Sequence, residues 1–266
     1  SGSKGPCHVS TDKTGKLLLA ANYAGGASTI TSINEDGSLS SEIQVVQHQG
    51  SSIDPNRQME PHAHSINVTP NNKFALVPDL GTDKVMIYKI DHDDNKLLSN
   101  DPSFGKVDPG MGPRHLEFHP NGKVLYVINE MGATITSFDF DQSSGELDPI
   151  QTISTVPDSE KMKSCADIHI SSNGKFLYGS NRGHSNLAIF SVSEDGRNLT
   201  NSGYQSTLGE TPRNFSIDPL DNYLLAANQD SGDIFTFKIN QDDGTLEPTG
   251  AKIDIPYAVC IKFLKR

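Results

Sequence analysis

The chain has 266 residues, which is long enough for one large domain whose core needs no disulfide or metal. Lys and Arg number 22 against 33 Asp and Glu, so the net charge is -11 and nucleic acids and anionic membranes are disfavoured partners. No apolar run approaches the roughly 20 residues of a membrane span, and the first residues lack a secretory signal. We therefore expect a soluble, cytoplasmic protein whose anionic ligands meet a local cluster of cations.

The three cysteines are Cys7, Cys165 and Cys260, an odd number of widely separated residues with no C-x-x-C pair. This pattern argues against a disulfide framework and against a zinc ribbon. The sequence predicts buried free thiols in a reducing compartment.

One pattern recurs five times, about every 50 residues, which is a spacing typical of propeller repeats. Each copy has a short alternating segment, a continuous apolar run and a β-branched or aromatic run, followed by a fourth strand. Clear examples are the alternating segments 64–68 and 116–118, the apolar runs 74–77, 124–128 and 224–227, and the β-branched runs 85–90 and 234–239.

Glycine turns separate these runs. Asn-Gly, Asp-Gly and Ser-Gly pairs favour hairpins because glycine readily adopts positive φ. They stand at residues 36–37, 121–122, 144–145, 173–174, 195–196 and 243–244. No stretch supports a long amphipathic helix, so the sequence predicts an all-β, single-domain β-propeller over 1–266 with five four-stranded blades.

The predicted blades are followed by a closing strand, and two polar insertions interrupt the repeat. We expect the insertions, 41–60 and 151–163, to lie over one face of the propeller. The units are 5–55, 56–108, 109–160, 161–207 and 208–254, and the closing strand is 255–264.

Polar residues recur where the first strand of each unit begins and where the second strand ends, which is one face of a propeller. The openings supply His8, His62, His64, Arg114 and Arg213, and the strand ends supply Asn22, Asp79, Glu130, Asn181, Arg182 and Gln229. Guanidinium groups suit phosphate and carboxylate, and a histidine can act as a general base near neutral pH. We therefore expect an anion site in which Arg114, Arg182, Glu130 and His64 share one pocket.

Other chemistries have less support in the sequence. His62 and His64 are two residues apart and could both face a metal, but no third ligand stands out, so we predict no metal and no cofactor. The chain has neither a G-x-S-x-G elbow nor a phosphate-binding G-x-x-x-x-G-K-[ST] loop. Attack by base-activated water is the mechanism that these residues permit.

Several longer motifs resemble one known family. They are GPCHVS (5–10), RQMEPHAHS (57–65), GPRHLEFHPNGK (112–123), SNRGHSN (180–186), TPRNFSIDP (211–219) and PYAVCIKFL (256–264). Together they are similar to the lactonase family of seven-bladed propellers, which includes propeller-type 6-phosphogluconolactonases and the fungal carboxy-muconate cyclase. The resemblance implies hydrolysis of a sugar-acid lactone, 6-phosphogluconolactone, in the pentose phosphate pathway.

The resemblance also implies site residues and a departure in length. In the cyclase branch, the residues matching His64, Arg114, Glu130 and Arg182 are implicated in the site, although His62 is an alternative match to His64. His8, His62, Asn22, Asp79, Asn181, Arg213 and Gln229 are then expected to bind substrate. Family members carry about two further blades before the GPCHVS-like motif, so we expect either a tightened five-unit ring or a homodimer through the open faces.

Two other functions remain open. A lactonising cyclase acting on a dicarboxylate would need the same kind of residues, and an interaction module would bind a protein or peptide on its top face. The chain contains no Trp, which weakens the interaction-module hypothesis because interface anchors are often aromatic.

Overall fold

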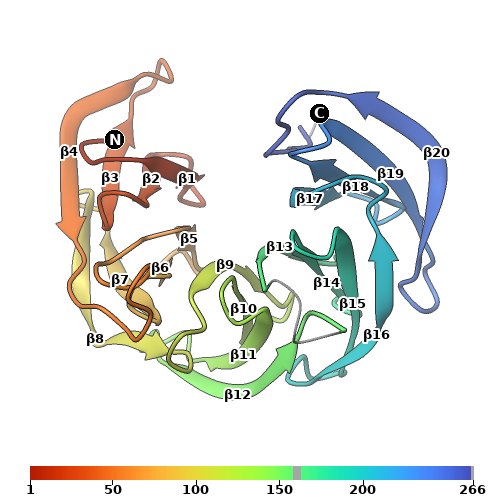
Figure 1. Cartoon of the computed structure of the whole chain (residues 1–266). Coiled ribbons are helices and arrows are strands. Elements are labelled where there is room, and N and C mark those ends of the chain that lie inside the picture. The colour runs from red at the N-terminus through yellow and green to blue at the C-terminus, as the bar shows by residue number, and fades with distance from the viewer. Residues whose placement is uncertain (158–162, 265–266) are drawn as a thin grey trace. The chain divides into compact units, whose positions relative to one another are not determined.

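The computed structural model describes residues 1–157 and 163–264, and every regular element within them is a β-strand. The strands form five four-stranded sheets, each built from strands consecutive in the chain (Figure 1). The prediction of an all-β chain with five four-stranded sheets is confirmed. No helix in the described residues is long and apolar enough to cross a membrane.

The chain divides into two compact units, which are described separately below. Unit 1 comprises Ser1–Leu116 and Asp139–Pro149, and unit 2 comprises Glu117–Phe138 and the residues from Ile150 onward. The prediction of a single domain stays a prediction.

Unit 1 holds the first two sheets. The first is β1 (Pro6–Thr11), β2 (Leu17–Asn22), β3 (Ala27–Ile33) and β4 (Leu39–Gln47), and the second is β5 (Asn67–Val68), β6 (Phe74–Asp79), β7 (Lys84–Asp91) and β8 (Lys96–Lys106).

The third sheet contributes residues to both units. It has the order β12 (Leu147–Ser154), β11 (Thr134–Phe140), β10 (Val124–Asn129) and β9 (Pro113–Phe118).

Unit 2 holds the last two sheets. The fourth is β13 (Cys165–Ile170), β14 (Phe176–Asn181), β15 (Asn186–Val192) and β16 (Leu199–Ser206), and the fifth is β17 (Pro212–Ile217), β18 (Tyr223–Asn228), β19 (Asp233–Ile239) and β20 (Leu246–Asp254).

The cores lie between neighbouring sheets. In unit 1, Leu19 and Ile30 of the first sheet pack in one cluster with Ala75 and Val77 of the second. In unit 2, Tyr178 of the fourth sheet packs with Phe215 and Phe237 of the fifth. Every residue of β6, β10 and β14 is buried, because side chains on both faces of such a strand meet a core. This explains the continuous apolar runs in the sequence.

The glycine turns follow the prediction. Gly37, Gly122, Gly145, Gly174, Gly196 and Gly244 all have φ between 68° and 82°, in the region that favours glycine.

The insertions differ in extent from the prediction. Residues 41–47 belong to β4, so the first insertion is only 48–60. The second begins after β12, and its residues 158–162 lie outside the described part of the chain.

Two predicted strands differ from the structure. The strand expected at 64–68 is only Asn67–Val68, and Ala63 forms an isolated bridge with Asp79. The closing strand expected at 255–264 is not formed, since no described strand pairs with this segment. The segment instead contacts the fifth sheet, where Ile261 N donates to Asn214 Oδ1 at 2.7 Å.

The cysteines are free thiols, as predicted, but only Cys165 is buried. Cys7 is exposed because it lies on β1, at the edge of the first sheet, and Cys260 is exposed in the segment that lacks strand partners. The expectation of three buried thiols is therefore wrong for Cys7 and Cys260.

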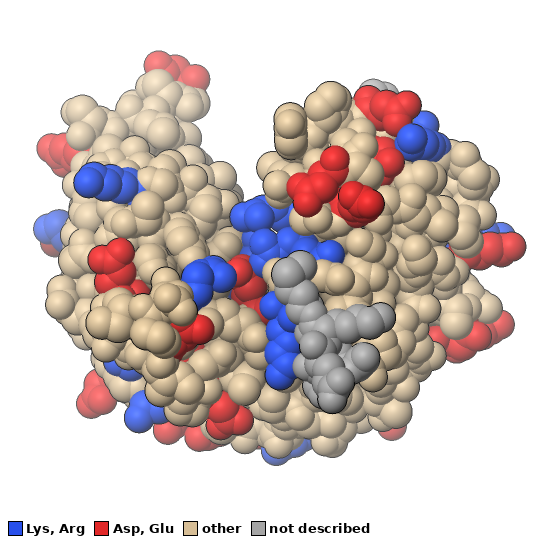
Figure 2. Space-filling view, viewed as in Figure 1, with Lys and Arg blue, Asp and Glu red and all other residues tan. Residues whose placement is uncertain are grey.

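Acidic and basic side chains both appear on the face drawn in Figure 2, where the acidic ones stand in several separate groups.

Candidate functional site

Unit 1 gathers four aromatic rings in a continuous contact. Tyr23 follows β2, His64 precedes β5, His115 lies on β9 and His8 lies on β1. The ring centroids of Tyr23 and His64 are 5.3 Å apart, those of His64 and His115 are 5.4 Å apart, and those of His115 and His8 are 5.6 Å apart. All three contacts are edge-on, the geometry that aromatic pairs favour. We call these four residues the ring row.

A buried arginine contacts one ring of this row. Arg114 is 2% exposed, and its Nη1 lies 3.2 Å from Nε2 of His115. Because a guanidinium only donates hydrogen bonds, Nε2 of His115 accepts and carries no proton. The ring row therefore contains an unprotonated imidazole nitrogen next to a cation, a combination suited to proton transfer beside a developing negative charge.

The two candidate histidines, His62 and His64, have different surroundings. His62 is half-buried, stacks on Tyr23 with centroids 4.5 Å apart, and donates from Nδ1 to the Tyr23 carbonyl oxygen at 3.0 Å. His64 is buried between Tyr23 and His115. The position of His64 next to His115 favours it over His62 as the base.

Asp79 is the centre of a buried hydrogen-bond network in unit 1. Its Oδ2 lies 2.6 Å from Nδ1 of His48, and Nε2 of His48 lies 2.9 Å from the Ser28 hydroxyl. Asp79 Oδ1 accepts from the backbone N–H groups of His62 and Gly81. Ser28 and Asp79 are fully buried and His48 is nearly so. The network holds the segment that carries His62 and His64 in place, and the predicted substrate contact of Asp79 stays a prediction.

The strand-end asparagines also bond to protein groups. Asn22 is fully buried and donates to the carbonyl oxygen of Ala27. Asn181 is fully buried and exchanges hydrogen bonds with Thr155, from Nδ2 to the carbonyl oxygen and from the hydroxyl to Oδ1. This geometry favours a role in holding loops for both residues, each of which was predicted to bind substrate.

Unit 2 contains an almost buried ion pair. Arg182 follows β14 and Glu130 follows β10, and Nη2 of Arg182 lies 3.0 Å from Oε2 of Glu130. The same Nη2 donates to the Cys165 carbonyl oxygen at 3.1 Å. The Arg182 side chain is 13% exposed and the Glu130 side chain 8% exposed, so the pair is largely removed from solvent. The structure thus brings together two of the four predicted catalytic residues in this unit.

A second network in unit 2 holds a charged histidine. Nε2 and Nδ1 of His169 each lie 3.2 Å from a carboxylate oxygen, of Asp167 and of Glu117 respectively. Burial lowers the pKa of His169, but the two carboxylates outweigh that effect and raise it to about 10. Asn214 also donates to Asp167. His169 is therefore an imidazolium at neutral pH and a poor candidate for a general base.

The remaining predicted residues lie in the two units as follows. His8 is half-buried, and its Nδ1 accepts from Ile66 N at 3.3 Å. Arg213 is half-buried on β17, and Gln229 is half-buried directly after β18. The prediction that Arg114, Arg182, Glu130 and His64 share one pocket stays a prediction.

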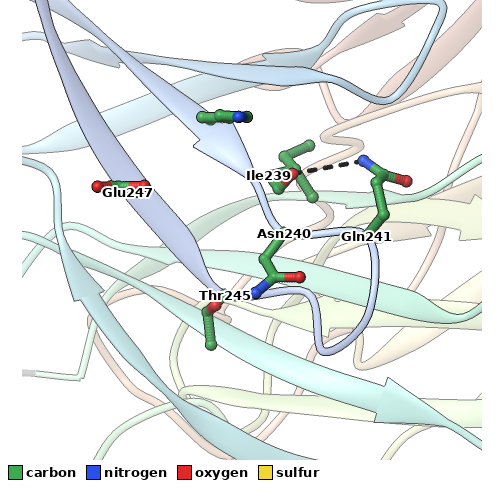
Figure 3. A pocket seen from close by; sticks show the side chains of 6 residues that line it. Ile239, Asn240, Gln241, Thr245 and Glu247 are labelled. Atoms are coloured by element: carbon green, nitrogen blue, oxygen red, sulfur yellow. Dashed lines mark hydrogen bonds between the residues drawn. The ribbon is translucent and has the colours of Figure 1, made fainter.

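A surface pocket of about 350 Å³ lies in unit 2, at the turn between β19 and β20 (Figure 3). Its lining includes Asn240, Gln241 and Thr245, and Gln241 Nε2 lies 3.5 Å from the Ile239 carbonyl oxygen. The pocket is at the opposite end of the fifth sheet from Arg213, because β18 begins beside this turn and ends beside β17's first residue. It is therefore separate from Arg213.

Sequence reasoning missed one contributor in unit 1. Tyr23 and His115 stand at a strand end and a strand opening, where the repeat places polar residues, but the first insertion gave no such signal. Arg57 stands in the first insertion and donates from Nη2 to the Tyr23 hydroxyl at 3.0 Å. Only the contact shows that this insertion reaches the ring row. Among the residues that the structure describes, no group of three or more His, Cys, Asp or Glu side chains could hold a metal ion.

Comparison with known proteins identifies the family of this chain. The family model described as "Lactonase, 7-bladed beta-propeller" matches residues 1–263. A Bacillus subtilis protein named 6-phosphogluconolactonase is 36% identical over 260 residues, which are 97% of this chain and 73% of that protein.

Two solved structures show the same fold. A Bacteroides fragilis protein aligns with a TM-score of 0.92 at 39% identity, covering 99% of this chain and 74% of that one. The Pseudomonas aeruginosa periplasmic gluconolactonase aligns with a TM-score of 0.88 at 30% identity, covering 95% of this chain and 71% of that one. The chain belongs to the lactonase family of 7-bladed β-propellers.

Proposed function

We propose that this protein hydrolyses the lactone of a phosphorylated sugar acid, 6-phosphogluconolactone, to the open-chain acid. The observation that carries the proposal is the contact of the His115 imidazole with both the His64 ring and the buried guanidinium of Arg114. The names of the relatives support the same reaction, since the Bacillus subtilis relative is a 6-phosphogluconolactonase.

The reaction needs one base and one cationic donor. His64 takes a proton from a water molecule as the water oxygen bonds to the lactone carbonyl carbon. The carbonyl oxygen becomes an oxyanion, which the Arg114 guanidinium stabilises. When the ring C–O bond breaks, the leaving alkoxide takes the proton from the His64 imidazolium. One water is consumed, and the product is a hydroxy acid.

His115 has a supporting part in this proposal. Its Nε2 accepts from Arg114 and its ring contacts that of His64, so His115 connects the guanidinium to the proposed base. Loss of His115 would leave a buried cation with fewer partners, so its removal affects the position of the charge as well as proton transfer.

The pair of Glu130 and Arg182 belongs to unit 2. The carboxylate holds the Arg182 guanidinium at a largely buried position after β14. The part of this pair in the reaction stays a prediction.

The test is hydrolysis of 6-phosphogluconolactone by the purified chain, followed by coupled oxidation of 6-phosphogluconate and corrected for spontaneous hydrolysis. His64→Gln should lower kcat by roughly a hundredfold or more, the usual contribution of a general base. His92→Gln is the matched control, because His92 is exposed and bonds only to the Asn72 carbonyl oxygen in the described structure. Equal rates for His64→Gln and the unaltered chain would contradict the proposal.

A further inference from the structure

A second arginine contacts the ring row at Tyr23. Arg57 Nη2 donates to the Tyr23 hydroxyl at 3.0 Å, whereas Arg114 contacts His115. Contacts therefore run from Arg57 through Tyr23, His64 and His115 to Arg114, with a guanidinium at each end. All five residues belong to unit 1.

The two arginines differ in their exposure to solvent. Arg114 is buried, whereas Arg57 is exposed. A buried guanidinium suits a charge that develops during the reaction, whereas an exposed one is accessible to a group that is already ionised when the substrate arrives.

The substrate named in the proposed function also carries a different group at each of its two ends. A lactone carbonyl lies at one end of 6-phosphogluconolactone and a phosphate lies at the other. Phosphate oxygens match the planar fork of N–H donors on arginine, and such contacts are stronger than neutral hydrogen bonds. We propose that Arg57 binds the phosphate of the substrate and gives the enzyme its preference for a phosphorylated lactone over the unphosphorylated one. This inference rests on the proposed function.

The loop holds Arg57 at a defined place. Asp54 Oδ1 accepts from the backbone N–H groups of Asn56 and Arg57, and the Asp54 carbonyl oxygen accepts from Gln58 N. Gln58 is fully buried, and its Nε2 donates to the Leu80 carbonyl oxygen at 2.8 Å. The insertion is thus anchored on the end of β6, so little ordering is needed when an anion binds.

The Tyr23 ring connects this loop to the proposed base. It stacks on His62 and meets His64 edge-on, while its hydroxyl accepts from Arg57. Tyr23→Phe would keep the ring contacts but remove the acceptor that places the guanidinium. It should therefore reduce the preference for the phosphorylated lactone in the same direction as loss of Arg57, by a smaller factor.

The names of the relatives differ in whether the lactone is phosphorylated. The Pseudomonas aeruginosa structure is of a gluconolactonase, whereas the Bacillus subtilis relative is a 6-phosphogluconolactonase. A residue that distinguishes the two substrates must contact the phosphate rather than the lactone ring.

The experiment compares 6-phosphogluconolactone with glucono-δ-lactone for the unaltered chain, Arg57→Gln and Arg57→Lys. We expect Arg57→Gln to lower kcat/KM for the phosphorylated lactone about tenfold to a hundredfold, as for loss of a charged hydrogen bond, and to leave glucono-δ-lactone within about twofold. Arg57→Lys should have a kcat/KM for the phosphorylated lactone between those of the unaltered chain and Arg57→Gln, because lysine keeps the charge but lacks the planar fork of donors. Arg197→Gln is the matched control, an exposed arginine on the turn before β16.

Three outcomes would overturn the inference: equal losses on both lactones, no loss on the phosphorylated lactone, or an unaltered chain that does not prefer the phosphorylated lactone. Calorimetric titration with 6-phosphogluconate and with gluconate provides a measurement that does not depend on turnover. If the unaltered chain hydrolyses neither lactone, the proposed function fails. Weaker binding of 6-phosphogluconate by Arg57→Gln, with gluconate binding unchanged, would still support the phosphate contact, and equal binding would refute it.

Discussion

Replacing Asp79 by alanine tests whether the buried network in unit 1 holds the segment that carries the proposed base. The substitution removes the acceptor of three donors, Nδ1 of His48 and the backbone N–H groups of His62 and Gly81. All lie in a part of the structure where Asp79 and Ser28 are fully buried. An unsatisfied buried donor costs about 1 kcal/mol or more, so we expect a loss of roughly 3 to 5 kcal/mol.

Urea denaturation followed by circular dichroism measures this loss, and the midpoint of thermal unfolding should fall by roughly 10 °C. Ser28→Ala removes one partner of His48 and should cost about 1 kcal/mol. Asp148→Ala, at an exposed position on β12, is the control and should change stability by less than about 0.5 kcal/mol. A cost for Asp79→Ala no larger than that of the control would refute the reasoning, because three orphaned donors could not then be buried.

Three further outcomes follow from named contacts. The pKa of His169 is raised to about 10, so its charge stabilises the folded chain fully below about pH 6.5, and this contribution is lost as the pH rises through about 10. The difference in stability between the unaltered chain and His169→Gln should therefore be large at pH 6 and small above pH 10. A difference that does not depend on pH would contradict this. Arg182→Lys should weaken binding of 6-phosphogluconate in calorimetry although the charge is kept, because lysine lacks the planar fork; equal affinity would count against direct anion contact. Gly81→Ala should reduce the preference for the phosphorylated lactone, since a methyl group there would overlap the Glu60 carbonyl oxygen and displace the Arg57 loop; an unchanged preference would show that the loop position is unimportant.

The sequence predicted the repeated architecture well because each strand type has its own pattern. The predicted apolar runs 74–77 and 124–128 lie in the fully buried strands β6 and β10, and every hairpin glycine named from the sequence adopts positive φ. These signals are local, so no knowledge of the tertiary structure was needed to find them.

The closing strand at 255–264 was predicted wrongly because pairing is not local. An apolar, β-branched segment becomes a strand only when a neighbouring strand supplies hydrogen bonds, and no described strand does so here. The second sheet also departs from the local pattern, since only Asn67 and Val68 of the expected strand 64–68 pair with β6 as a strand.

The candidate site was predictable in its residue types more than in its roles. The repeat placed His64, Arg114, Glu130 and Arg182 at strand openings and ends, and the structure joins His64 to His115 and Glu130 to Arg182. The repeat pattern could not show that Asp79 belongs to a buried network, in which its carboxylate bonds to His48, 31 residues earlier in the chain. Such a partner is invisible in a repeat pattern, because only one copy of the repeat has this histidine at that place.

The most direct measurement is the rate of 6-phosphogluconolactone hydrolysis by the purified, folded chain as a function of pH, with Arg114→Gln alongside it. The account predicts a rate well above spontaneous hydrolysis, falling at low pH as an essential imidazole becomes protonated, and a loss of roughly a hundredfold in kcat for Arg114→Gln, as for removal of an oxyanion donor. A folded chain that hydrolyses the lactone no faster than buffer, or an Arg114→Gln variant with an unchanged kcat, would contradict the claim that the ring row and its buried guanidinium carry out the reaction.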